Sequence, residues 1–503
     1  EYIRGAGTRA AASVYQMVRE LNSLTGNAYP ELPDAFSRVS GHIDTVLKPA
    51  VYSTDGPLVL PLQAISLANI QEVGGKMANL GEVSSGAGLP SGFAVTVTAY
   101  RLFLKENGLA EEIEKRIRAT DMDDMSQLFT LSAGLQQAVQ QAPLPAALED
   151  AIWGQIEILV DKYMSEDIRL ALRSSAVGED ALGASFAGQY RTELNVLPDE
   201  VCDIWKEIVA SKYTVAALSY RYQRGIPDDA APMSVGVLRM VRALAGGVAY
   251  SEDPVAEGKD SGSRNVVLNS VPGLPEAVVD GGVMPDTFTF SHSHPARLVS
   301  RHIACKASRL DTDTSLATGI RKTMLTPEEG SAPSITDEQA REVSRITLAL
   351  EEYYAKPQDV EWALETTRDG KGTHVIILQS RPLQLEKSEN GAEAQPEIRE
   401  EDVSVPPEEI LLQGGIAVSS GPVHIVHRDL DMLSFPKGGI LVVERAYPRW
   451  ATLLPRAAGM ISENGGTAGH LASVCREYHV PALFSLAEAE KTLANAREVT
   501  LDA

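Results

Sequence analysis

Two spacings of apolar residues run along residues 58–385, and together they predict a domain that mixes helices with strands. Helical spacing, with apolar side chains three and four positions apart, is clearest over 110–119, 147–164 and 337–355. Short β-rich runs fall between them and predict strands at 169–172, 234–238, 265–268, 360–365 and 375–379. We therefore expect an α/β or α+β domain, of a size that commonly divides into two lobes.

This pattern stops at residues 386–409, which read EKSENGAEAQPEIREEDVSVPPEE. The segment carries nine acidic residues, two basic ones and three prolines, with almost nothing able to fill a core. Charge repulsion and proline keep such a chain extended and solvated. We therefore expect a flexible linker between parts that move relative to each other.

Periodic segments return at residues 410–503 and predict a small α/β domain. Strands are expected at 440–443, 459–462 and 498–501, and a helix at 467–478. Because the sequence stops directly after the last of these strands, we expect this domain to be incomplete. At the other end, residues 1–57 read as a helical extension, with a helix at 9–24, and carry no recognisable chemistry.

Composition narrows the class of protein. A chain of 503 residues exceeds one ordinary core and suggests about three domains. No run of eighteen apolar residues occurs, so we expect no membrane span. The net charge of −23 would repel a polyphosphate backbone, which argues against nucleic acid as a partner. Three widely spaced cysteines fit a reduced, cytoplasmic protein better than a disulfide scaffold.

Two cationic positions could bind phosphate. Lys76 follows Gly74 and Gly75 at a turn that runs into a helix, where glycine lets the backbone approach an anion and lysine supplies a point charge. Arg173 ends a predicted strand within a turn of small residues, where its guanidinium could clamp phosphate oxygens. Taken alone, these residues are explained better by a surface lysine on a capped helix and an exposed strand-end arginine.

A second pattern predicts a hairpin with a polar face. Residues 359–364 and 376–382 read as antiparallel strands joined through the turn at 369–372. Side chains two apart on a strand share a face, which pairs Asp359 with Glu361 and Gln379 with Arg381. Facing strands would offer carboxylate and amide oxygens to Mg²⁺, with an arginine beside them for phosphate. An ordinary hairpin with a polar face remains the alternative.

His470 gives the sharpest local pattern. The segment SENGGTAGHLAS ends a strand, passes through a glycine-rich loop and places the histidine at the start of a helix. A helix N-terminus disfavours the imidazolium and favours a bound anion. His470 would therefore be neutral, nucleophilic and able to carry phosphate. A structural histidine is the alternative.

Taken together, these segments resemble the family of phosphoenolpyruvate synthase, pyruvate phosphate dikinase and rifampicin phosphotransferase. The resemblance covers nearly all of 58–385 and 410–503, and its phrases occur in family order. They are VGGKMANLGEV, AGLPSGFAVT, LALRSSAVGED, SFAGQYRTELNV, GGVAYSEDP, VPGLPEAVVDGGVMPD, QDVEWALE, ILQSRPL and ISENGGTAGHLASVCREYHVPALF. It implies a two-lobed ATP-grasp domain followed by a swivelling phosphohistidine domain.

The resemblance also implies roles for individual residues. Lys76 and Arg173 would contact the ATP phosphates, and Glu276 would lie near the nucleotide. Glu361 and Gln379 would ligate Mg²⁺. In the same set, Asp359 would lie nearby, Arg381 would contact the transferring phosphate, and His470 would be the phosphorylated carrier. ATP would be cleaved to AMP, with the β-phosphate passing to an acceptor such as pyruvate.

Some positions depart from the family pattern. Gly469 stands where a hydroxyl residue usually precedes the histidine, and His479 stands where glycine is common. The family's acceptor domain is missing from these residues, so an acceptor domain or subunit would lie elsewhere. A regulatory member that binds ATP and uses its last domain as a conformational switch is therefore the alternative to an enzyme.

Overall fold

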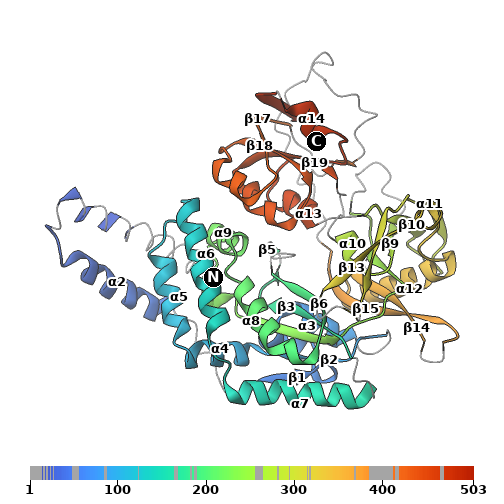
Figure 1. Ribbon diagram of the computed structural model, residues 1–503, viewed down its shortest axis with the longest axis horizontal. Helices are drawn as coiled ribbons and strands as arrows, with labels where there is room; N and C mark the ends of the chain where they lie inside the picture. The colour runs from blue at the N-terminus through green and yellow to red at the C-terminus, as the bar shows by residue number, and fades with distance from the viewer. Residues whose placement is uncertain are drawn as a thin grey trace. The chain divides into compact units, whose positions relative to one another are not determined.

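The chain forms two compact units in a computed structural model (Figure 1). One unit consists of residues 1–82, 91–240 and 314–319, and the other of 83–90, 241–313 and 320–503. The structure describes residues 14, 17–18, 21–22, 24–25, 28–47, 56–83, 88–122, 124–163, 168–181, 184–185, 190–254, 264–279, 283–293, 295–313, 315, 319–367, 370–383, 412–413, 418–464, 470–494 and 496–502.

The first unit is built on a five-stranded sheet with the order β1-β2-β7-β3-β6, in which every neighbouring pair is antiparallel. Its strands are β1 (Val59–Pro61), β2 (Gly92–Val95), β3 (Leu170–Ala176), β6 (Thr192–Val196) and β7 (Met233–Arg239). A short ribbon, β4 (Asp180–Ala181) with β5 (Ala184–Ser185), follows β3. The central strands β2, β3 and β7 are buried along nearly their whole length.

The described part of the first unit also contains helices. They are α2 (Leu32–Leu47), α3 (Ile70–Glu82), α4 (Val97–Glu106), α5 (Leu109–Arg118), α6 (Met125–Gln141), α7 (Ala146–Tyr163), α8 (Val201–Ser211) and α9 (Val215–Arg224), with short 3-10 turns η1 (Leu62–Ala64), η2 (Leu67–Asn69), η4 (Pro198–Glu200) and η5 (Asp228–Ala230). In α7 the buried residues are Leu148, Ile152, Ile156 and Leu159, which recur at helical spacing. That stripe packs α7 against β1 and β2 (Figure 1).

The second unit opens with a six-stranded antiparallel sheet, in the order β11-β10-β9-β8-β14-β15. Its strands are β8 (Ala245–Tyr250), β9 (Asn265–Pro272), β10 (Asp286–Ser291), β11 (Leu298–His302), β14 (Gln358–Thr366) and β15 (Thr373–Pro382), beside a ribbon of β12 (Ser308–Thr312) and β13 (Ile320–Met324). Its helices are α10 (Glu276–Val279), α11 (Pro327–Ser331) and α12 (Asp337–Tyr354). A capping box between Thr336 and Gln339 starts α12, which packs on β8, β9, β10 and β14.

The C-terminal residues of this unit form another sheet, ordered β16-β20-β19-β18-β17-β21. The three inner pairings are parallel and the two edge pairings antiparallel. Its elements are β16 (Leu412–Gln413), β17 (Val418–Ile425), η8 (Asp429–Ser434), β18 (Gly439–Arg445), η9 (Pro448–Arg456), β19 (Ala457–Asn464), α13 (His470–Glu477), β20 (Ala482–Phe484), α14 (Ala489–Leu493) and β21 (Glu498–Asp502).

Strand β18 shows why this sheet has two covered faces. Ile440 and Val442 lie in one apolar cluster, with Ala489 of α14, while Leu441 and Val443 lie in another, with Leu471 of α13. Successive side chains of a strand point to opposite faces, so a continuous apolar run fits a strand buried on both sides. The run Ile440–Val443 is therefore explained by helices on both faces of the sheet.

The mixed content of helix and sheet confirms the expected fold class. The helices expected at 110–119, 147–164 and 337–355 are α5, α7 and α12, and every strand predicted in Sequence analysis is present. The expected linker at 386–409 lies outside the described residues, as does most of the helix expected at 9–24. Within the described ranges, no helix is long and apolar enough to cross a bilayer, and the three cysteines are free.

Candidate active site

A kink in α3 brings Lys76 to a helix start in the first unit. Gly74 interrupts α3 with φ 73° and ψ 169°, and a Cβ there would lie 2.0 Å from the carbonyl oxygen of Ser175 on β3. Only glycine fits so close an approach at a positive φ. The Ser175 hydroxyl accepts from the amide of Met77 at 3.1 Å and donates to the carbonyl of Val73 at 2.7 Å. Lys76 therefore lies in the first turn after the kink.

The ammonium of Lys76 is held by a carboxylate that we did not single out in the sequence. Lys76 Nζ lies 2.6 Å from Glu179 Oε1, and the two side chains are 14% and 0% exposed. Glu179 follows β3 in a turn, and its other oxygen accepts from the amide of Ala176 at 3.0 Å. The sequence holds one clue, because Glu179 lies within the same phrase, LALRSSAVGED, as Arg173.

Arg173 lies within β3 and not at its end, so the prediction that Arg173 ends the strand was wrong. Strand β3 continues to Ala176, and Arg173 pairs in register with Gly236 of β7 and Thr192 of β6. Pairing with β7 holds the small residues after Arg173 extended despite their weak strand propensity. Arg173 is half-buried, and it shares a sheet face with Ser175, the face on which α3 packs.

In the second unit, the predicted hairpin is present. β14 and β15 are antiparallel, with Asp359 opposite Arg381 and Glu361 opposite Gln379. A shift in register directly after Glu361 marks a bulge. The alternation of a strand therefore places all four polar side chains on one face, as the sequence indicated.

Asp359 and Arg381 form a tight ion pair on this face. Asp359 Oδ2 lies 2.8 Å from Arg381 Nε and 2.7 Å from Nη2, and the two side chains are 10% and 25% exposed. Two nitrogens of the guanidinium converge on this one carboxylate oxygen, and the contacts fix the orientation of the guanidinium. Gln379 is buried and Glu361 half-buried beside them. The register places the Glu361 carboxylate opposite the Gln379 amide.

Glu276 is the first residue of α10, which packs against β8 and β9. The helix follows Gly273, whose φ is 79° and whose Cβ would lie 2.2 Å from the carbonyl oxygen of Leu310. Glycine is therefore required where the chain turns from β9 into α10. Glu276 is half-buried at this helix start.

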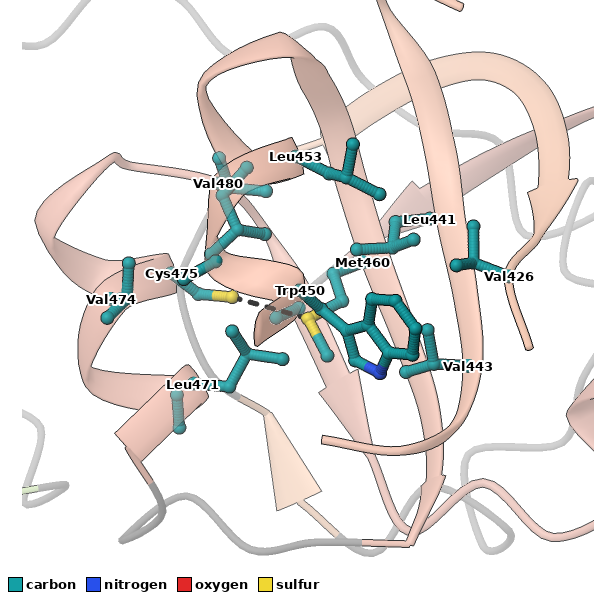
Figure 2. Close-up of a cluster of buried hydrophobic side chains, with 14 of the residues drawn as sticks. Val426, Leu441, Val443, Trp450, Leu453, Met460, Leu471, Val474, Cys475 and Val480 are labelled. Atoms are coloured by element: carbon teal, nitrogen blue, oxygen red, sulfur yellow. Dashed lines mark hydrogen bonds between the residues drawn. The ribbon is translucent and has the colours of Figure 1, made fainter. Parts of the chain in front are cut away.

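His470 is the first residue of α13, as predicted, and the helix is fixed by the core beneath it. Leu471, Val474 and Cys475 of α13 point into a cluster with Trp450 and Met460, shown in Figure 2, where Cys475 Sγ lies 3.5 Å from Met460 Sδ. Residues 465–469, the expected glycine-rich loop, lie outside the described residues. Parallel pairing of β18 with β19 brings Arg445 beside Asn464, the strand end that precedes this loop.

The predicted site residues thus fall into distinct groups. Lys76 and Arg173 lie on neighbouring elements of the first unit, while Asp359, Glu361, Gln379 and Arg381 share one hairpin face of the second. Glu276 lies at the start of α10 and His470 at the start of α13.

Two families of known proteins match successive parts of the chain. Residues 70–402 match the family described as pyruvate phosphate dikinase, AMP/ATP-binding domain. The chain belongs to the pyruvate phosphate dikinase family. Residues 435–503 match the mobile domain of PEP-utilising enzymes, so an ATP-grasp-type domain and a mobile domain occur together. The first match contains all the predicted site residues except His470, which falls in the second.

Curated relatives within this pyruvate phosphate dikinase family are phosphoenolpyruvate synthases. The chain is 33% identical to that of Neisseria meningitidis over 461 residues and 33% identical to that of Deinococcus radiodurans over 463 residues. It is 31% identical to the Escherichia coli K12 protein over 465 residues. Each comparison covers 88% of this chain but 56% of the relative, so the chain spans little more than half their length.

Proposed function

We propose that this member of the pyruvate phosphate dikinase family is an ATP-dependent phosphotransferase. It transfers phosphate from ATP to His470, releases AMP, and passes phosphate on to an acceptor such as pyruvate. The observation that carries this proposal is the polar face of the β14–β15 hairpin, where Asp359 pairs with Arg381 and Glu361 faces Gln379. An aligned guanidinium beside two oxygen-bearing side chains suits phosphate and a hard cation.

In the proposed nucleotide site, Lys76 and Arg173 bind the ATP phosphates and Glu276 lies near the nucleotide. Both cations belong to elements that fix them, since Lys76 is ion-paired to Glu179 and Arg173 lies within a central strand. Fixed positive charge stabilises the charge of a transferring phosphoryl group without needing to reorganise during the reaction.

Mg²⁺ fits the donor set of the hairpin. Glu361 supplies a carboxylate and Gln379 an amide oxygen, both hard ligands of the kind Mg²⁺ prefers, and Asp359 lies nearby. When bound, Mg²⁺ offsets the negative charge of the phosphates. Asp359 has a different task, because its bonds orient Arg381 toward the transferring phosphate.

His470 is the proposed nucleophile and carrier. A helix N-terminus favours the neutral imidazole over the imidazolium and favours the phosphate added to it. Attack of the imidazole on the β-phosphorus forms the N–P bond, breaks the α–β bridge and leaves AMP with the electron pair of that bond. The histidine then holds the β- and γ-phosphates until the γ-phosphate is released and the β-phosphate reaches the acceptor.

Pyruvate is the favoured acceptor because the relatives are phosphoenolpyruvate synthases. Since the chain spans 56% of the Neisseria meningitidis protein, we propose that the acceptor site lies on residues or a subunit outside this sequence.

Labelling tests this proposal. With Mg²⁺ and ATP labelled in the β-phosphate, we expect acid-labile, base-stable label on His470 in the wild type. His470→Ala should abolish the label without weakening ATP binding, because the residue belongs to a different domain match from the nucleotide site. ATP binding without any label on the wild-type chain would instead support a regulatory member of the family.

A further inference from the structure

Glu179 is the ion-pair partner of Lys76, one of the proposed phosphate-binding cations. It closes a turn after β3, in which its amide donates to the carbonyl of Ala176 at 3.3 Å while its carboxylate accepts from the amide of Ala176 at 3.0 Å. These reciprocal bonds fold the side chain back over the end of β3. The carboxylate is fully buried, so bulk water cannot solvate its charge.

The second oxygen of Glu179 is aimed at Lys76, 2.6 Å from its Nζ. A lysine side chain is flexible, and its ammonium carries three N–H donors. The Ser175 hydroxyl already holds the backbone around Lys76 through Val73 and Met77. The ion pair with Glu179 therefore holds the far end of the Lys76 side chain, while these bonds hold its backbone.

Two other lysines of the described chain show what a purely structural pair looks like. Lys212 lies 3.1 Å from Asp228, and Lys306 lies 2.5 Å from Asp286; both lysines are 0% exposed. Each also donates to a backbone carbonyl, that of Asp228 or Ala304. Lys76 differs, because 14% of its side-chain surface is exposed, whereas the side chain of its partner Glu179 is fully buried. The exposed surface of this pair therefore belongs to the lysine side chain.

Further charges surround the carboxylate. Burial raises the pKa of Tyr190 to about 12; the charge of Arg221 opposes this rise, and the carboxylate of Glu179 adds to it. Arg221 donates to the hydroxyl of Tyr190 at 3.4 Å. Glu179 thus lies close enough to Tyr190 for its carboxylate to act on that hydroxyl, and Lys76 is its ion-pair partner.

We propose that Glu179 is a positioning residue for phosphotransfer, acting through Lys76, whose ammonium it directs toward the phosphates of ATP. This inference rests on the proposed function of Lys76. Glu179 is not expected to strengthen ATP binding, since its negative charge lies near an anionic ligand. Its effect belongs to the transfer step, where a misplaced cation is costly.

Glu179→Gln tests the proposal, with Glu112→Gln as a matched control. Glu112 also forms an ion pair in the first unit, with its Oε1 2.7 Å from Arg116 Nε, but its side chain on α5 is 42% exposed. A glutamine at 179 retains an acceptor for the Ala176 amide and turns its NH₂ toward Lys76. We expect labelling of His470 to slow by at least about tenfold, because a small misplacement of a positioned group costs that much or more. The Kd for ATP should stay within about threefold, as expected when only the transfer step is impaired.

The result that would overturn the proposal is labelling by Glu179→Gln at the rate of the wild type and of Glu112→Gln. A parallel loss of ATP affinity, labelling and melting temperature would also overturn it, because it would show a structural role alone. Acylation of the Lys76 amine, followed by mass spectrometry, gives a readout independent of phosphotransfer. Loss of the ion pair should speed this acylation in Glu179→Gln, and an unchanged rate would refute the positioning even if the wild type carried no phosphohistidine.

Discussion

At the scale of single side chains, the ion pair between Arg381 and Asp359 links two residues of the proposed site to the stability of the fold. Asp359 is 8% exposed as a residue and accepts two bonds from one guanidinium. Removing the guanidinium leaves a largely buried carboxylate without its partner, and this costs more than the pair itself contributes.

We therefore predict that Arg381→Ala lowers the free energy of unfolding by about 1–3 kcal/mol, the usual cost of an unsatisfied buried group. Arg345→Ala serves as the control, because Arg345 and Glu342 form an ion pair with side chains 59% and 47% exposed. Exposed pairs contribute little, so the control should change stability by less than about 1 kcal/mol. Urea unfolding of both variants measures the difference, and equal losses would contradict the burial argument.

Lys76 and Glu179 should be coupled more strongly, since Glu179 is fully enclosed. Lys76→Ala removes the ion-pair partner of this buried carboxylate, for which we predict a loss of about 3–5 kcal/mol. Glu179→Gln in the same chain removes that charge and should recover most of the loss. A double-mutant cycle measured by chemical unfolding gives the coupling energy. If the two single changes simply add, the ion pair has no part in stability.

At the scale of elements, α3 is two helical segments joined at Gly74, and the joint places Lys76. Alanine at this position would have a positive φ and a Cβ 2.0 Å from the carbonyl oxygen of Ser175. The neighbouring atom belongs to the backbone of β3 and cannot move aside cheaply. The kink is therefore fixed by packing against the sheet.

We predict that Gly74→Ala destabilises the first unit by at least about 1–3 kcal/mol, the scale of local backbone strain. Gly154→Ala on α7 is the matched control, because a Cβ there meets nothing within 4 Å. Alanine favours a helix interior over glycine by about 1 kcal/mol, so this control should be neutral or stabilising. Thermal melting compares the two; a Gly74 variant as stable as the wild type would show that the kink relaxes.

The elements differ in how well the sequence predicts them. β14 and β15 are adjacent in the chain, so alternation and a short turn were enough to predict the hairpin and its polar face. β3 was predicted to end at Arg173 because serine and alanine follow, yet pairing with β7 extends it to Ala176. Glu179 was missed because its role, like the length of β3, depends on contacts between distant parts of the sequence. Its partner Lys76 lies in a distant part of the sequence and meets it only through the packing of α3 on β3.

At the scale of the whole molecule, the order of the family phrases indicated an ATP-grasp-type domain followed by a mobile domain, and the family matches confirm this. Propensity and periodicity alone would give helices and strands without saying which residues act together. The roles of the predicted site residues stay predictions, because they concern contacts with ATP and the proposed transfer of phosphate to His470. These residues are Lys76, Arg173, Glu276, Glu361, Gln379, Arg381 and His470.

The composition of residues 386–409 carries a prediction about motion. An acidic segment with three prolines is a good protease substrate, and a phosphate carrier must reach both ATP and an acceptor. We expect a broad-specificity protease to cut first within 386–409, releasing two resistant parts. Mass spectrometry of the earliest fragments locates the cut. Cleavage inside either flanking domain before this segment would count against a swivelling domain.

The central claim is that His470 takes the β- and γ-phosphates from ATP and leaves AMP. Its first step needs no acceptor, so it can be measured on this chain as exchange of labelled AMP into ATP with Mg²⁺ present. We predict exchange in the wild type and none in His470→Ala, with ATP binding retained in both. Exchange that persists in His470→Ala, or wild-type protein that binds ATP and exchanges labelled ADP rather than AMP, would contradict the account.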